Sequence, residues 1–161
     1  MGGSCGAGNV SPAAEFNILA DPEAAHVCFT AGRPVTMVGL DVTRKALCYP
    51  SVVERMGRVG GPASELFVAL MGHFCRTQKE VFGWEGGPLH DPVTIAYLTD
   101  PAVLKVQPMN VRIDIDHGQS YGRTNCDAFD YLGLPHTADV AVDIDAERFW
   151  DLVEAALARY R

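Results

Sequence analysis

The chain has 161 residues, of which 48% are hydrophobic and 20% are charged, and its formal net charge is −7. This length and composition fit one globular domain over residues 1–161 and exclude a disordered chain. The negative charge argues against nucleic-acid binding, and no apolar run reaches the roughly 18 residues that cross a bilayer. Five separated cysteines without a CxxC pair and an N-terminus without a signal peptide predict reduced thiols in a cytoplasmic protein.

The first half of the chain predicts mainly helices. Residues 21–23 (Asp-Pro-Glu) are typical of a helix start, and Gly32 is typical of its end. The nearly all-apolar run 34–40 (PVTMVGL) predicts a strand that is covered on both faces. Further helices are expected over 50–59 and 62–82, the second with apolar side chains at helical spacing.

The second half combines helices with alternating strands. Asp91 and Pro92 predict a helix that runs to about residue 98. Apolar and polar residues alternate over 111–116 and indicate a half-exposed strand, and residues 140–142 indicate another. Asp145 is the expected cap of a final helix. The pattern therefore predicts an α/β fold with an antiparallel pair of strands late in the chain.

The glycine-rich start is unusual for such a fold. A turn like residues 2–6 (GGSCG) normally follows a buried strand at the sheet edge where ligands bind, but only Met1 precedes it. The chain therefore resembles a piece of a larger domain. On this interpretation the strand over 34–40 has an uncovered side with a large apolar patch, and the protein is expected to form homo-oligomers.

The first polar cluster is GNVSPAAEFN, residues 8–17. Asn9, Glu15 and Asn17 carry the amide and carboxylate groups that match the vicinal hydroxyls of a sugar. The alternative is a capped loop in which Asn9 and Ser11 only satisfy a turn, and spacing alone favours that alternative.

The second polar cluster is GGPLHDP, residues 86–92. Asp91 is either the cap of the following helix or a ligand of a hard cation such as calcium. His90 beside it is either a structural histidine or a general acid or ligand contact.

Together with PVTMVGLDVT, these motifs resemble the inosine-uridine preferring nucleoside hydrolases over essentially the whole chain. The resemblance implies the C-terminal half of a Rossmann-like nucleoside hydrolase fold, a mixed sheet with flanking helices. It also implies calcium-assisted hydrolysis of the N-glycosidic bond of a ribonucleoside to ribose and free base.

The resemblance also assigns site residues. Asp91 matches a calcium ligand of the family, and His90 matches the histidine beside the leaving base. The ribose contacts match four residues: Met1, Asn9, Glu15 and Asn17.

Two further positions match the wall around the nucleobase, on a helix that is mobile in the family. They carry Gln78 and Phe82 where tyrosine is common, so the resemblance leaves purine or pyrimidine preference open. A core position is an equally good interpretation of Phe82.

One family feature is missing. The family's other calcium ligands and its general base come from an N-terminal DxDxxxDD motif that this sequence does not contain, and residues 114–116 (Asp-Ile-Asp) resemble it only in letters. The first hypothesis is therefore a nucleoside hydrolase that is inactive without a missing N-terminal half as partner. The second is a truncated, non-catalytic family remnant that acts as a binding or interaction module.

Overall fold

The computed structural model describes residues 1–160. They divide into two compact units, which are described separately below. The first unit combines Met1–Val42 with Leu104–Asp143, and the second combines Thr43–Val103 with the segment from Ile144 onward.

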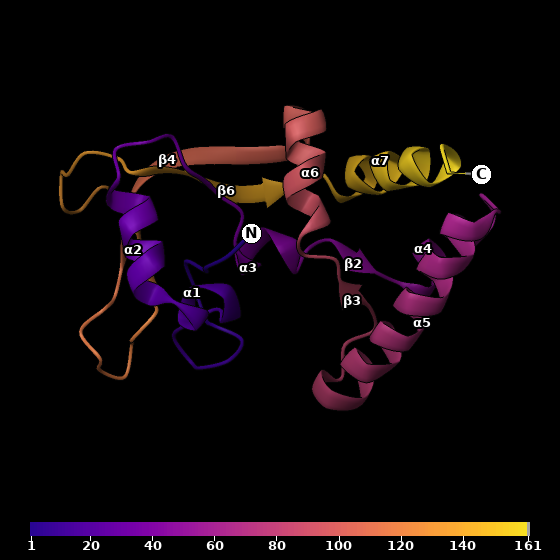
Figure 1. Cartoon of the computed structure of the whole chain (residues 1–161), viewed down its shortest axis with the longest axis horizontal. Helices are drawn as coiled ribbons and strands as arrows, with labels where there is room; N and C mark the ends of the chain where they lie inside the picture. Colours follow the sequence, from indigo (N-terminus) through magenta and orange to yellow (C-terminus); the bar gives the residue numbers. More distant parts are fainter. Residues whose placement is uncertain (161) are drawn as a thin grey trace. The chain divides into compact units, whose positions relative to one another are not determined.

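The first unit is built on a four-stranded sheet with the order β1-β6-β4-β5 (Figure 1). Its strands are β1 (Thr36–Met37), β4 (Leu104–Ile113), β5 (Thr124–Asp127) and β6 (Ala138–Ile144), and its helices are α1 (Phe16–Ala20) and α2 (Pro22–Thr30). β1 pairs with β6 in parallel, and β4 pairs with β5 in antiparallel orientation. The mixed sheet is confirmed, and β4 lies in an antiparallel pair, but its partner β5 is a strand that the sequence pattern did not predict.

Alternating side chains of β4 build the core of this unit. Met109, Val111 and Ile113 are buried in one cluster with Ile18 of α1 and Phe29 of α2. This agrees with the predicted alternation at Val111 and Ile113, but β4 ends at Ile113, so residues 114–116 lie outside the strand. The expected helix start is confirmed, because the Asp21 side chain accepts a hydrogen bond from the Ala24 amide at 2.9 Å.

The run 34–40 departs from the prediction. Only Thr36 and Met37 form a strand, because the Val38 carbonyl accepts a hydrogen bond from Gly2 and the Leu40 amide donates to Gly3. The expectation of an exposed apolar patch on this run is wrong, because Met37, Val38 and Leu40 are all buried. Exposed apolar side chains lie elsewhere, on α5 and α6 and over residues 129–132.

The second unit is mainly helical. It contains the helices α4 (Pro50–Gly57), α5 (Pro62–Phe82), α6 (Pro92–Thr99) and α7 (Ala146–Ala158), the 3-10 turn Pro101–Val103, and the small antiparallel sheet of β2 (Leu47–Cys48) and β3 (Gly87–Pro88). The short helix α3 (Leu40–Thr43) crosses from the first unit into the second. α4 packs against α5, and α6 packs against α7. None of the helices in residues 1–160 is long and apolar enough to span a membrane.

All four long helices begin as the sequence predicts. Proline occupies the first turn of α4, α5 and α6, and the Asp145 carboxylate accepts a hydrogen bond from the Arg148 amide at the start of α7. Proline is favoured there because its missing N–H would have no partner in the helix. The helices of this unit are therefore confirmed.

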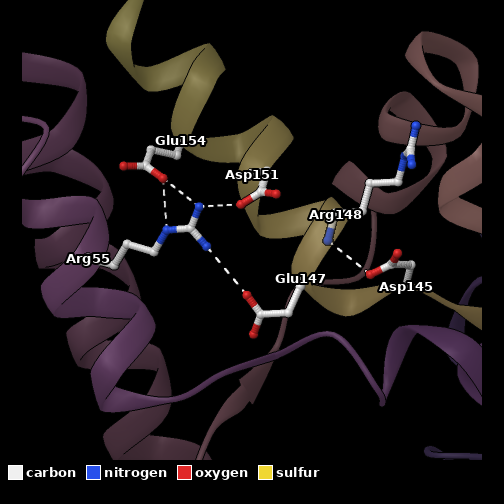
Figure 2. A network of polar contacts seen from close by, with 6 residues as sticks. All are labelled: Arg55, Asp145, Glu147, Arg148, Asp151 and Glu154. Atoms are coloured by element: carbon white, nitrogen blue, oxygen red, sulfur yellow. Dashed lines mark hydrogen bonds and ion pairs between the residues drawn. The ribbon is translucent and has the colours of Figure 1, made fainter.

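A cluster of charges joins α4 to α7 (Figure 2). The Arg55 guanidinium donates to Glu154 from Nε at 2.8 Å and also lies against Asp151 and Glu147. The hydrogen bond that Arg55 donates to Asp151, followed by the one it donates to Glu154, raises the pKa of Arg55. One cation is therefore shared by three carboxylates on one face of α7.

Substitution of Arg55 by alanine is expected to lower the free energy of unfolding by about 1 kcal/mol, because three carboxylates then repel one another. Urea unfolding at low salt and at about 1 M NaCl tests this, and the loss should shrink at high salt. Arg58→Ala is the control, because Arg58 is exposed and its ion pair with Glu54 lies within one helix turn. Equal losses for the two variants would contradict a special role of Arg55.

Candidate functional site

The glycine-rich segment at the start of the chain is fixed by residues that are distant in sequence. The Leu40 amide donates to the Gly3 carbonyl at 2.9 Å. The Ser4 amide donates to the Thr124 hydroxyl at 2.8 Å, and this hydroxyl donates back to the Ser4 carbonyl at 2.6 Å. Gly3 has φ +79°, and a Cβ there would lie 2.8 Å from Thr124 Cγ2, so only glycine fits without strain.

Glu15 holds this segment to the start of α1. Its carboxylate is buried, with an exposed fraction of 3%. It accepts hydrogen bonds from the amide of Gly3 at 2.9 Å and from the amide of Asn17 at 3.0 Å. Backbone donors therefore satisfy a buried negative charge and fix its position.

The other three predicted ribose contacts lie around the same turn. Asn17 Nδ2 donates to the Met1 carbonyl at 3.2 Å and approaches Met1 Sδ at 3.3 Å. Asn9 Oδ1 accepts a hydrogen bond from the Phe16 amide at 2.9 Å. The structure thus brings all four residues together within the first unit, and the side chains of Asn9 and Asn17 are exposed there.

The simpler interpretation of this loop is also realised. Ser11 Oγ accepts hydrogen bonds from the amides of Ala13 and Ala14, and Asn9 satisfies the start of α1. These turn contacts leave the Asn9 amide group as a possible donor, so local capping and ligand binding are compatible.

His90 lies in the second unit, directly after β3. The pairing of β2 with β3 and the hydrogen bond from the Leu89 amide to the Ala46 carbonyl, 3.2 Å long, fix the loop that carries it. His90 Nδ1 lies 2.7 Å from the hydroxyl of Thr43, a fully buried residue. This contact fixes the ring plane and directs Nε2 away from Thr43.

Asp91 does not act as the cap that local sequence favours. It stands before α6 with a helical backbone, and its side chain makes no capping hydrogen bond. The carboxylate is on an exposed residue. The alternative in which the Asp91 side chain caps α6 is therefore wrong, and the carboxylate remains available to a ligand.

The described residues do not complete a calcium site. Within residues 1–160 no group of three or more His, Cys, Asp or Glu side chains could hold a metal ion. Calcium requires about six to eight oxygen ligands, and Asp91 supplies one carboxylate. The acidic residues Asp114 and Asp116 lie in a turn. Asp114 accepts hydrogen bonds from the Ser120 hydroxyl and the Asp116 amide, and these bonds lower the pKa of its carboxyl group.

The two residues expected around the nucleobase lie on α5. Phe82 is 57% exposed and its ring contacts that of Trp84 at a centroid distance of 5.3 Å, so a core position for Phe82 is wrong. Gln78 is half-buried, one turn earlier. Both positions follow Cys75, whose sulfur donates to the Cys48 carbonyl and accepts from the Gly87 amide, so that α5 is anchored to the small sheet.

Comparison with known proteins identifies the family. The family described as inosine-uridine preferring nucleoside hydrolase matches residues 1–151. The chain belongs to this family. It is 50% identical over 160 residues to the pyrimidine-specific ribonucleoside hydrolase RihB of Shigella flexneri serotype 5b, and 50% identical to the RihB of Escherichia coli O17:K52:H18. Each match covers 99% of this chain and 51% of the relative.

Solved structures agree with the family assignment. A purine-preferring ribonucleoside hydrolase from Gardnerella vaginalis superposes with a TM-score of 0.87 at 31% identity, and a plant nucleoside hydrolase superposes with 0.86 at 31%. These matches cover 99% and 98% of this chain but 51% and 52% of those chains. This nucleoside hydrolase chain therefore spans about half the length of the relatives that it matches.

The residues that the sequence predicts for the site fall into two groups. Met1, Asn9, Glu15 and Asn17 lie in the first unit, and Gln78, Phe82, His90 and Asp91 lie in the second. The sequence analysis missed two threonines. Thr124 fixes the glycine-rich segment through Ser4, and Thr43 fixes the loop that carries His90. Thr43 ends the motif PVTMVGLDVT, and this motif was the available signal for it.

The contact between Thr43 and His90 predicts a measurable effect. Thr43→Val removes the hydroxyl with little change in volume, so Nδ1 loses its partner at a cost of about 1 kcal/mol in stability. The side-chain ¹⁵N shifts of His90 should change because Nδ1 no longer shares a hydrogen bond with the hydroxyl. Thr43→Ser is the control that keeps the hydroxyl. Unchanged ¹⁵N shifts in Thr43→Val would show that the Thr43 hydroxyl does not bond to Nδ1.

Proposed function

We propose that this chain forms the ribose- and base-binding half of a calcium-dependent ribonucleoside hydrolase that prefers pyrimidine nucleosides. The observation that carries the proposal is the group of Met1, Asn9, Glu15 and Asn17 around one rigid turn. The pyrimidine preference is supported by the relatives at 50% identity, which are named as pyrimidine-specific.

The chemistry of the first group suits a ribose. Asn9 and Asn17 offer exposed amides, and the buried Glu15 carboxylate is held rigid by two backbone amides. Such groups bind hydroxyls that are both donors and acceptors. Cleavage of an N-glycosidic bond develops positive charge on the sugar ring, and a fixed carboxylate nearby stabilises that charge more than it stabilises the neutral substrate.

The second group suits the departing base. With Nδ1 held by Thr43, His90 can present an N–H at Nε2 to the leaving nitrogen or oxygen. Phe82 offers an exposed aromatic ring and Gln78 an amide for contact with a nucleobase. We infer that the protein acts in the cytoplasm.

The remaining chemistry requires groups from outside this chain. Asp91 is our candidate for one calcium ligand, and the other ligands and the base for the attacking water would come from the amino-terminal half that the relatives carry. A metal bound there would supply an activated water. The competing proposal, a non-catalytic binding module, is favoured by the lack of further metal ligands around Asp91 in residues 1–160.

A joined protein tests the proposed function. It consists of the half of the Shigella flexneri relative that lies outside the match, fused in frame to this chain. Ribose release from uridine and cytidine should exceed release from inosine, and Asn17→Ala should raise KM for all three. A folded joined protein that binds none of these nucleosides would favour the non-catalytic module.

A further inference from the structure

Four of the five cysteines form two pairs of neighbouring thiols, one pair in each unit. All five cysteines carry free thiols. Cys5 and Cys126 share a hydrogen bond in the first unit, and Cys48 and Cys75 share one in the second. The proposed function uses neither pair. In a reducing compartment, disulfides are usually transient and serve catalysis or redox sensing, so paired free thiols are candidates for such a role.

Backbone contacts hold the segment of Cys5 against the strand of Cys126. The Ser4 amide donates to the Thr124 hydroxyl at 2.8 Å, and this hydroxyl donates to the Ser4 carbonyl at 2.6 Å. The two bonds join the residue before Cys5 to a residue two positions before Cys126. Both cysteine side chains are half-buried and pack against the same apolar cluster around β4. The fold therefore fixes the two sulfurs next to each other, as a disulfide requires.

The two thiols of this pair differ in reactivity. The hydrogen bond from the Cys126 thiol lowers the pKa of Cys5. The same hydrogen bond, followed by burial, raises the pKa of Cys126. Asp41, which accepts a hydrogen bond from the Cys5 amide at 2.8 Å, opposes the ionisation of Cys5 but does not outweigh Cys126. Because the thiolate is the nucleophile, Cys5 is the sulfur that reacts first.

The second pair offers a contrast within the same chain. Cys48 is fully buried, and this burial, followed by the charge of Cys75, raises its pKa to about 12. Only about one in 10⁵ of such thiols is ionised at pH 7. The Cys75 sulfur donates to the Cys48 carbonyl at 3.2 Å and accepts from the Gly87 amide at 3.3 Å. This pair therefore joins α5 to the small sheet as unreactive thiols.

We propose that Cys5 and Cys126 form a reversible disulfide when the protein meets a peroxide. The Cys5 thiolate attacks one peroxide oxygen, the O–O bond breaks, and Cys5 becomes a sulfenic acid. The leaving hydroxide takes the proton that Cys5 lost and becomes water. The Cys126 sulfur then attacks the Cys5 sulfur, the S–O bond breaks, and the second hydroxide leaves as water with the Cys126 proton. Two thiols lose two electrons in all, and one peroxide is reduced to two waters.

The first step also prepares the second. The negative charge of the Cys5 thiolate is one of the causes that raise the pKa of Cys126. A sulfenic acid at Cys5 no longer carries this charge, so Cys126 ionises more readily once its partner is oxidised. The pair thus supplies both the sulfur that is oxidised and the sulfur that resolves it.

The disulfide reaches the predicted ribose contacts through the backbone. The Gly3 amide, two residues before Cys5, donates to the Glu15 carboxylate at 2.9 Å. An S–S bond of about 2.05 Å is much shorter than a hydrogen bond between two sulfurs, so its formation moves the glycine-rich segment towards β5. We expect weaker ribose binding in the oxidised protein. This consequence rests on the proposed function, whereas the disulfide itself does not.

Peroxide treatment followed by mass spectrometry tests the site. The chain carries Cys28→Ser, because the exposed Cys28 would otherwise link two molecules. After exposure to hydrogen peroxide at pH 7, the remaining thiols are alkylated in denaturant and the peptides are analysed. The link between Cys5 and Cys126 should form at least about tenfold faster than a link between Cys48 and Cys75, and dithiothreitol should reverse it. A link between Cys48 and Cys75 that forms first, or equal oxidation of all four thiols, would overturn the proposal.

Two serine variants test the order of the steps. In Cys126→Ser the hydroxyl still donates to Cys5, and Cys5 should accumulate as sulfenic and then sulfinic acid because no thiol resolves it. In Cys5→Ser the Cys126 thiol should stay available for alkylation. Rapid oxidation of Cys126 in Cys5→Ser would overturn the assignment of the first nucleophile. If either variant fails to melt cooperatively, the rates of the two links in the Cys28→Ser chain decide the proposal.

The joined protein separates this inference from the proposed function. There, oxidation should raise KM for uridine by at least about threefold, and dithiothreitol should restore it. A disulfide that forms in a joined protein without ribose release would support the modification site and contradict the enzymatic proposal. An active joined protein in which Cys5 and Cys126 stay reduced would do the reverse.

Discussion

The isolated chain is expected to release no detectable ribose from uridine or inosine. Loss of a general base typically lowers the rate ~10² to 10⁴-fold, and loss of a metal-activated water adds several kcal/mol to the barrier. On the proposed function the two losses multiply, because the base and the bound metal would together generate the nucleophile. A reducing-sugar assay on the chain, with and without added calcium, measures this.

The joined protein is the reference for that assay. It should release ribose, and a calcium chelator should abolish the activity. There, His90→Ala should slow mainly those substrates whose base must leave with a proton. Ribose release by the isolated chain at an ordinary enzymatic rate, unaffected by the chelator, would refute the assignment of the missing groups.

Helices were predictable because their signals are local. α5 has the predicted bounds of 62 and 82, since proline marks its start and Gly83 with φ +71° ends it. The small sheet of β2 and β3 was not predicted, because strands of two residues show no periodicity. The run 34–40 was predicted too long as a strand, because hydrogen bonds to the distant residues Gly2 and Gly3 bend it.

In the candidate site too, contacts between neighbours in the sequence were predictable, and contacts between distant residues were not. Asn9, Glu15 and Asn17 are close in sequence, so their grouping in space was predictable from one motif. The contact of Thr124 with Ser4 spans 120 residues, and that of Thr43 with His90 spans 47. Local pattern contains no information on such pairs. The residues around Asp91 are typical of a helix cap, but in the structure its carboxylate makes no capping hydrogen bond to α6.

Glu15 shows how one residue can serve both folding and the proposed function. Its carboxylate joins the amide of Gly3, in the glycine-rich segment, to the amide of Asn17, in α1. The same rigid position is what a charge-stabilising group at a sugar requires. A substitution there therefore should affect stability in the isolated chain and ribose binding in the joined protein.

Glu15→Ala is expected to lower the free energy of unfolding of the isolated chain by about 2 to 4 kcal/mol. The substitution leaves two backbone amides without their acceptor, and each unsatisfied buried donor costs about 1 to 3 kcal/mol. Glu15→Gln keeps one carbonyl oxygen and should lose about half as much, because its NH₂ group faces a second donor. Urea unfolding measures both variants.

The control is Glu80→Ala, which replaces an exposed glutamate on α5 and should change stability by less than about 0.5 kcal/mol. Equal stability of Glu15→Ala and the unsubstituted chain would show that the turn holds without its carboxylate, and Glu15 would then be free to act on a ligand alone.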